Sequence, residues 1–175
     1  MTKVLVIFYS YTGTARRLAQ LLCAQQGWAM AEVLERRPRT GARGTWRCVL
    51  DSVFRRRPAF RYQGPIPDGF DVVVLIAPIW VSRLAGPMRS FVHDRRTMLP
   101  DVAVLSVMGS RGAPAAVAEV ARLTGRAPLL SGAFTTREVV DGSCAGRLQA
   151  FGDAVRDAKA PATAVRPTVW SPQAV

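Results

Sequence analysis

Apolar residues gather in two kinds of segment along this chain, and each kind predicts a different element. Two short segments are almost continuously apolar and β-branched, KVLVIFY at Lys3–Tyr9 and FDVVVLIA at Phe70–Ala77. Without polar alternation, such runs are typical of central parallel strands that are buried on both faces. Three weaker runs predict further strands at Trp28–Leu34, Val102–Val107 and Pro128–Phe134.

Longer segments carry apolar residues three and four positions apart, which predicts amphipathic helices. In the clearest one, Thr14–Gln26, the apolar positions recur at helical spacing and Gly27 follows as a stop signal. The same periodicity predicts helices at Gly86–Arg95, Ala113–Leu123 and Ser143–Lys159. A further apolar stripe predicts a helix that ends before Pro58; its residues are Trp46, Val49, Leu50, Val53 and Phe54.

The five strands alternate with helices, which predicts an α/β fold: a doubly wound parallel sheet with helices on both faces. In such a sheet a ligand binds beyond the carboxyl ends of the strands, where the strand order reverses. We expect one domain over residues 1–159, in which 36–64 is a basic insertion with an amphipathic helix. Residues 160–175 are rich in proline and alanine and are expected to form a flexible C-terminal tail.

The loop after the first strand has the composition of an anion site. It reads Ser10, Tyr11, Thr12, Gly13, Thr14 and Ala15. Its three hydroxyls and its glycine let the backbone wrap an anion, and the following helix adds the positive end of its dipole. The pattern is neither GxxxxGK[ST] nor GxGxxG. The alternative is a capped helix start that binds no ligand.

Two more loops leave the sheet at the same edge. The loop after the third strand contains Pro78, Ile79, Trp80 and Val81, and Trp80 offers a flat apolar face. The loop after the fourth strand contains Met108, Gly109, Ser110, Arg111 and Gly112, whose glycines allow close approach of the backbone to a ligand. The alternatives are that Trp80 is a packing residue and that the later loop is an ordinary strand-to-helix turn.

The segment FYSYTGTARRLAQLL resembles the opening of flavodoxins, whose pattern after the first strand is [ST]-x-T-G-x-T. Ser10, Thr12 and Gly13 match this pattern, whereas Ala15 stands where the family has a hydroxyl. The segment APIW is similar to [SGT]-P-[IV]-[WY] after the family's third strand, and GPMRSFV resembles the helix that follows. The resemblance covers residues 3–158 and implies a flavodoxin-like five-stranded sheet of order 2-1-3-4-5.

The resemblance also implies FMN as the cofactor, held by the three loops. The first loop would bind the phosphate, Trp80 would contact the isoalloxazine ring, and the third loop would close on the pyrimidine side. Ala15 would leave out one phosphate hydrogen bond, at a cost of about 1 kcal/mol. Arg83 and Arg111, in or beside these loops, would favour the reduced anion and make the second reduction potential less negative than in an acidic flavodoxin. The alternative is that both arginines point into solvent.

Three functions remain open on this sequence. The first is electron transfer or flavin-dependent oxidoreduction with a redox partner protein. The second is an NAD(P)H-dependent FMN reductase or quinone reductase, working as a homodimer, in which the 36–64 insertion covers either a neighbouring subunit or the active site. The third is an interaction module of flavodoxin fold that has lost FMN. No catalytic triad or paired carboxylates are evident, so no catalytic residue is assigned.

The net charge of +12 is concentrated in one segment. Nine arginines lie between Arg36 and Arg61 against a single acid, Asp51. Such a patch is suited to an acidic partner, an anionic membrane surface or nucleic acid, or it is only a solvated basic face. Nucleic acid is not expected, because few aromatic residues are interleaved with the arginines.

Other classes of site have little support. The cysteines, Cys23, Cys48 and Cys144, are widely spaced and are expected to be reduced thiols. His93 is the single histidine and has no co-ligand nearby in sequence, so no metal site is expected. No apolar run approaches the roughly 20 residues of a transmembrane helix. We therefore expect a cytoplasmic protein.

Overall fold

The computed structural model describes residues 2–36, 57–80, 82–109 and 112–159. The helix expected at 46–54, the tail at 160–175 and six arginines of the basic segment lie outside these ranges; the six are Arg37, Arg39, Arg43, Arg47, Arg55 and Arg56. The same holds for three predicted site residues, Val81, Ser110 and Arg111.

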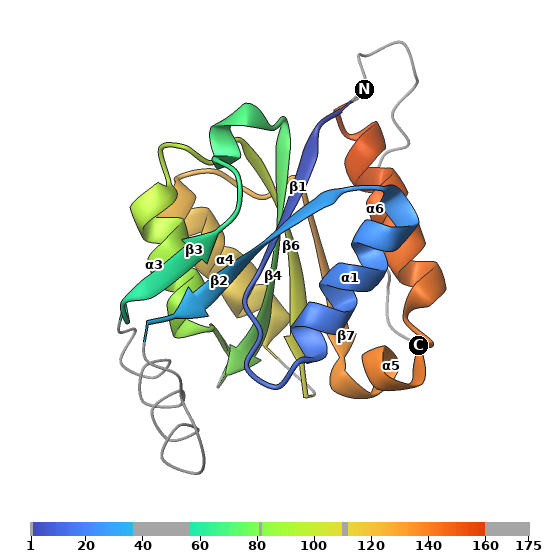
Figure 1. Ribbon diagram of the computed structural model, residues 1–175. Coiled ribbons are helices and arrows are strands. Elements are labelled where there is room, and N and C mark those ends of the chain that lie inside the picture. The colour runs from blue at the N-terminus through green and yellow to red at the C-terminus, as the bar shows by residue number, and fades with distance from the viewer. Residues whose placement is uncertain (1, 37–56, 81, 110–111, 160–175) are drawn as a thin grey trace.

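Helices and strands alternate along most of the described chain (Figure 1). The strands are β1 (Val4–Phe8), β2 (Ala29–Glu35), β3 (Phe60–Gln63), β4 (Val72–Trp80), β5 (Arg83–Leu84), β6 (Asp101–Met108) and β7 (Leu130–Thr135). The helices are α1 (Thr14–Gln26), α3 (Gly86–Arg95), α4 (Ala113–Thr124), α5 (Thr136–Asp141) and α6 (Ala145–Asp157), with a 3-10 turn η1 (Pro67–Gly69). The bounds of α1 are those predicted, because Gly27 takes a left-handed φ of 70° and its N–H closes the helix on the Cys23 carbonyl.

The five long strands form a parallel sheet in the order β2-β1-β4-β6-β7, which confirms the predicted order. The predicted count of five is wrong, because two short antiparallel strands are added. β3 pairs with the outer edge of β2, from Glu35 opposite Phe60 to Glu32 opposite Gln63. It covers an edge that would otherwise leave backbone groups unpaired.

The second added strand, β5, corrects the expectation that Pro78–Ser82 is a loop. β4 continues through Pro78 to Trp80 and then turns back into β5. Proline is tolerated here because β1 has already ended: Tyr9 donates to the Ile76 carbonyl, and Pro78 faces that same side two residues later. No ladder hydrogen bond to β1 is therefore lost at Pro78.

Helices cover both faces of the sheet, as predicted (Figure 1). On one face Val4, Val6 and Phe8 of β1 pack with buried residues of α1, α5 and α6. On the other face Leu5 and Ile7 pack with buried residues of α3 and α4. Each face thus has its own apolar core, which explains why the central strands show no polar alternation.

One helix was not predicted. The segment expected as a single helix over Ser143–Lys159 is preceded by the short α5, and α6 itself begins at Ala145. Gly142, with a φ of 81°, separates the two helices. Because α5 follows β7 directly in the chain, its first residue lies at the carboxyl end of that strand.

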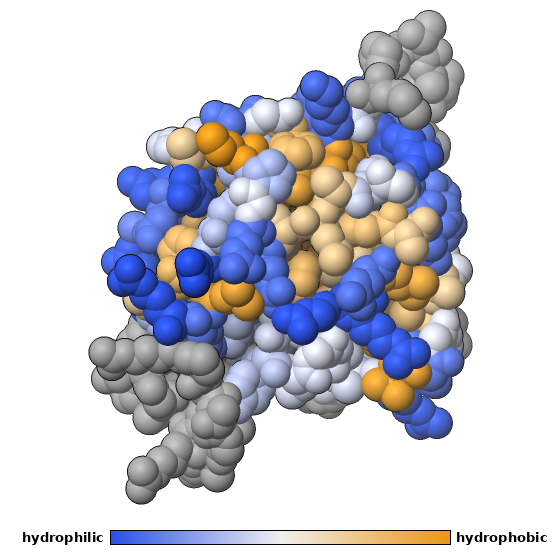
Figure 2. Space-filling view, viewed as in Figure 1, coloured by the Kyte–Doolittle hydropathy of each residue, from blue (hydrophilic) through white to orange (hydrophobic). Residues whose placement is uncertain are grey.

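The surface seen in Figure 2 is mildly apolar across its centre, where β2 crosses the view, and mostly hydrophilic around it, with a few strongly apolar residues near the edge. Met30 of β2 is 45% exposed. Among the described residues, no helix is long and apolar enough to cross a membrane.

Candidate functional site

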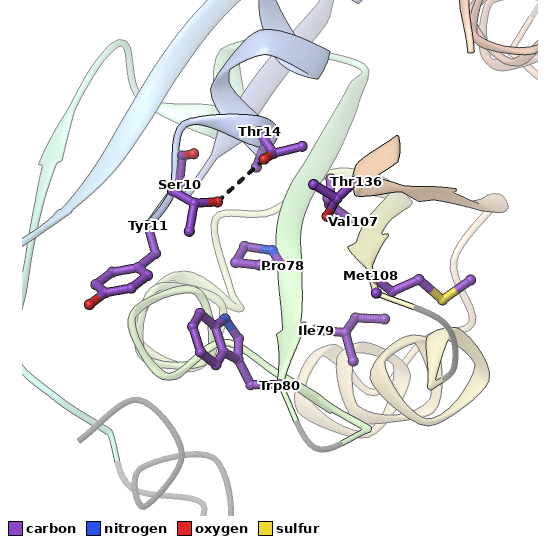
Figure 3. Close-up of a pocket in the computed structure, with 12 residues that line it drawn as sticks. Ser10, Tyr11, Thr14, Pro78, Ile79, Trp80, Val107, Met108 and Thr136 are labelled. Carbon is purple, nitrogen blue, oxygen red and sulfur yellow. Dashed lines mark hydrogen bonds between the residues drawn. The ribbon is translucent and has the colours of Figure 1, made fainter. Parts of the chain in front are cut away.

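A pocket of about 180 Å³ opens beyond the carboxyl ends of β1, β4 and β6 (Figure 3). From β1 the chain first adds β2 on one side and then β4 on the other, so the strand order reverses at β1. The lining residues are Ser10, Tyr11, Thr12, Thr14, Ala15, Pro78, Ile79, Trp80, Val107, Met108, Gly109 and Thr136. The structure therefore brings residues from all three predicted loops into one pocket.

The first loop supplies the polar end of this pocket. Gly13 takes a left-handed φ of 91° and its N–H donates to Ser10 Oγ at 3.1 Å. The hydroxyls of Thr12 and Thr14 lie 3.3 Å apart, shown by the dashed line in Figure 3. α1 has no side-chain cap and no acidic residue in its first turn. Its first N–H groups are thus suited to an anion.

Ala15 also lines the pocket, but its methyl group is buried in the core beneath α1 with 2% exposure. Thr14, one position earlier, supplies a hydroxyl to the pocket instead. The loop thus lacks the hydroxyl of the flavodoxin pattern at Ala15 and carries a hydroxyl in the pocket at Thr14.

The second loop supplies an aromatic wall. The rings of Tyr11 and Trp80 meet edge to face, with centroids 5.4 Å apart and planes at 75°. Ile79 and Pro78 line the pocket beside them. Trp80 is partly exposed, so one end of the pocket is polar and the other end is aromatic and open to solvent.

The third loop contributes through Met108 and Gly109, which line the pocket. Gly112 does not line it; neither does Gly13. Gly112 caps α4 with a φ of 113°, and a Cβ there would lie 2.7 Å from Ser82 Cα. Gly112 therefore allows the third loop to pack directly on the second.

Two lining residues, Val107 and Thr136, were not predicted. Thr136 reaches the pocket because it is the first residue of α5, directly after β7. The N-cap before it is a full capping box: Glu138 donates its N–H to Thr135 Oγ1, and Thr135 donates its N–H to Glu138 Oε2. The signal T-T-R-E in the sequence marks this helix start.

Among the described residues, charged side chains do not line the pocket. None of the described lining residues carries a carboxylate, a guanidinium or an ammonium group. Arg83 lies opposite Trp80 in the β4–β5 ladder but does not line the pocket. The hydrogen bond from the Thr135 N–H lowers the pKa of the Glu138 carboxyl, and Arg147 adds to this effect. No cluster of metal-ligating side chains occurs in the described ranges.

No protein-family model matches this chain. No curated protein matches it either. Solved structures resemble it at low sequence identity. A flavoprotein from Lactobacillus acidophilus NCFM in complex with FMN superposes with a TM-score of 0.67 at 18% identity, covering 81% of this chain and 98% of its own.

Two flavodoxins resemble the chain over a larger share of its length. One from the domain Archaea gives a TM-score of 0.55 at 13% identity, covering 90% of this chain and 99% of its own. The flavodoxin, WrbA-like protein from Agrobacterium tumefaciens gives 0.53 at 10% identity, covering 91% and 100%. These likenesses establish that the chain has the flavodoxin-like fold.

Proposed function

We propose that this flavodoxin-like chain binds FMN in the pocket beyond β1, β4 and β6 and serves as a redox protein. The observation that carries the proposal is the pairing of two unlike ends within one pocket. A hydroxyl-rich helix N-terminus forms one end, and the Tyr11–Trp80 wall forms the other. FMN has the same two ends, a phosphate and a planar aromatic ring.

The phosphate end fits the first loop. Ser10, Thr12 and Thr14 offer hydroxyl donors, and the uncapped N–H groups of the first turn of α1 offer backbone donors. No carboxylate among the described lining residues would repel the anion. These residues would bind and orient the phosphate without a lysine or a metal ion.

The ring end fits the aromatic wall and the third loop. Trp80 and Tyr11 present apolar surface at the open side, and Met108 and Gly109 line the pocket from β6. These side chains would exclude water from the ring and fix its orientation. Bound there, FMN would supply the electron-transfer chemistry, while the protein supplies position and electrostatics.

For the electron partner, we propose an acidic redox protein. The arginines between Arg36 and Arg61 follow β2, whose carboxyl end lies at the same edge of the sheet as the pocket. Of this basic segment, Arg36, Arg57 and Arg61 belong to the described chain. An acidic surface approaching this edge would be steered toward the cofactor.

Two experiments test this proposal, one for the cofactor and one for the electron donor. Titration of the purified protein with FMN, followed by flavin absorption and fluorescence, tests the cofactor. Anaerobic mixing of the FMN-loaded protein with NADPH then tests the alternative of a reductase. We expect no direct oxidation of NADPH at a rate compatible with turnover; rapid oxidation would replace electron transfer by a flavin-dependent reductase.

A further inference from the structure

A buried pair of opposite charges joins α3 and α4 beside the short strand β5. Arg89 of α3 and Glu119 of α4 have side chains only 3% and 6% exposed. Arg89 Nε donates to Glu119 Oε1, and its Nη2 lies 3.5 Å from Glu119 Oε2. Such a pair costs desolvation energy, so its presence alone does not show that it stabilises the fold.

Both charged groups also bind the backbone of one residue, Leu84 of β5. The Leu84 N–H donates to Glu119 Oε2 at 3.2 Å, and Arg89 Nη2 donates to the Leu84 carbonyl at 2.7 Å. Leu84 is itself buried. The ion pair thus holds both backbone groups of a single strand residue between two helices.

β5 needs such support because it is short. Its two residues pair with β4, Leu84 with Ile79 and Arg83 with Trp80. A two-residue antiparallel ladder has little stability of its own. Trp80, which forms the aromatic wall with Tyr11, sits at the last position of this ladder.

We infer that Arg89 and Glu119 are positioning residues, which clamp β5 and thereby hold the Trp80 hairpin where it forms the ring-binding wall of the pocket. This inference rests on the proposed function for the identity of the ring. Neither side chain lines the pocket, so both act through Leu84. Loss of the clamp should weaken contact with the ring and leave contact with the phosphate intact.

The test replaces both charges together, as Arg89→Met with Glu119→Leu, because this removes the hydrogen bonds to the Leu84 backbone without leaving one unpaired charge in the core. In the FMN-free double variant, hydrogen–deuterium exchange should rise in a peptide spanning 79–85 and stay unchanged in β1 and β7. The affinities for FMN and for riboflavin should fall by the same factor, about tenfold, as expected for the loss of one aromatic contact.

The matched control is Gln26→Leu. Gln26 is also buried, and its side-chain amide joins α1 to α6 through the Gln149 carbonyl and Asp153 on the other face of the sheet. This variant should lose stability without changing exchange at 79–85 or the two affinities. An equal fall of flavin affinity in both proteins would mean that only global stability matters, which would overturn the inference.

The outcomes separate this inference from the proposed function. If wild-type protein binds neither FMN nor riboflavin, the proposed function fails, and the clamp is judged by exchange in the FMN-free protein. A rise confined to 79–85 then supports the clamp, and unchanged exchange there overturns it. If wild-type protein binds both flavins and the double variant binds them equally well, the clamp is wrong while the proposed function stands.

Discussion

Thr12 offers a test of the proposal that the first loop binds the FMN phosphate. It lines the pocket and lies 3.3 Å from the Thr14 hydroxyl. Replacing Thr12 by Val keeps the shape and removes the donor. We expect FMN to bind about tenfold more weakly, as for a lost hydrogen bond to a charged group, and riboflavin to bind unchanged.

The control for Thr12→Val is Ser131→Ala, which removes an exposed hydroxyl from β7. It should change neither affinity. Isothermal titration calorimetry with both flavins measures the difference. An equal loss of riboflavin affinity in the Thr12→Val protein would contradict a phosphate role for this loop.

Gly112 is a second residue with a specific physical requirement. Its φ of 113° is unfavourable for a side chain, and a Cβ would lie 2.7 Å from the Ser82 backbone. Gly112→Ala should therefore destabilise the protein by about 2 kcal/mol and lower its melting temperature by about 4–8 °C. In the same loop, a Cβ added at Gly109 would have no neighbouring atom within 4 Å. Gly109→Ala should change the melting temperature by less than about 2 °C.

At the residue scale, the sequence predicts the pocket where local chemistry and position coincide. Ser10 and Thr12 follow a strand, open a helix and carry hydroxyls, so their place could be foreseen. Gly112 was expected at the ligand but packs on Ser82 instead. Thr136 was missed because its place depends on where β7 ends, which is set by pairing with β6 up to Met108 opposite Thr135.

Among the elements, α5 offers a pH-dependent test. Glu138 at its start has a pKa below its usual 4.5, chiefly because the Thr135 N–H binds the carboxylate. The folded state therefore favours the charged form. Its contribution to stability is complete above about pH 4.5 and is lost as the pH falls through the lowered folded pKa.

Glu138→Gln keeps an acceptor in the capping box and removes the charge. Urea unfolding should show the variant less stable than wild type at about pH 6.5, with the difference shrinking toward about pH 3. A difference of the same size at both pH values would contradict the assigned cause of the pKa shift.

At the element scale, long segments with a clear period were predictable and short ones were not. α1 was predicted to the residue because its apolar positions, its polar start and Gly27 all agree. β3 and β5 have four and two residues, too few to show a period. Both are strands only because a longer strand offers them an unpaired edge, which is a property of the tertiary structure.

If FMN binds as proposed, the net charge of +12 of the whole molecule predicts the second reduction potential of the cofactor. A positive surrounding field favours the reduced, negatively charged cofactor, so the second reduction potential should be less negative than in an acidic flavodoxin. Salt screens this field. Spectroelectrochemistry at low and high ionic strength should therefore show the potential becoming more negative as salt is added.

Arg83 provides the comparison for this prediction. Since it does not line the pocket, Arg83→Gln should shift the potential less than the change in salt does. A potential that is independent of salt, but shifts strongly in the Arg83→Gln protein, would show that one arginine rather than the summed charge sets it.

At the scale of the molecule, the parallel strand order and the two-sided helix cover were predictable, because alternating strands and helices with buried runs allow few topologies. The closeness of the three loops followed from that topology. The Arg89–Glu119 contact could not be predicted from the topology, because it joins residues 30 positions apart through the backbone of Leu84.

The most direct test of the central claim is an absorption and fluorescence titration of the purified protein with FMN. If FMN binds as proposed, the flavin bands shift and the FMN fluorescence is quenched as the ring meets the Tyr11–Trp80 wall, and both changes saturate stoichiometrically at micromolar concentrations. FMN that stays free at these concentrations would contradict the account and leave an interaction module built on a flavodoxin-like fold.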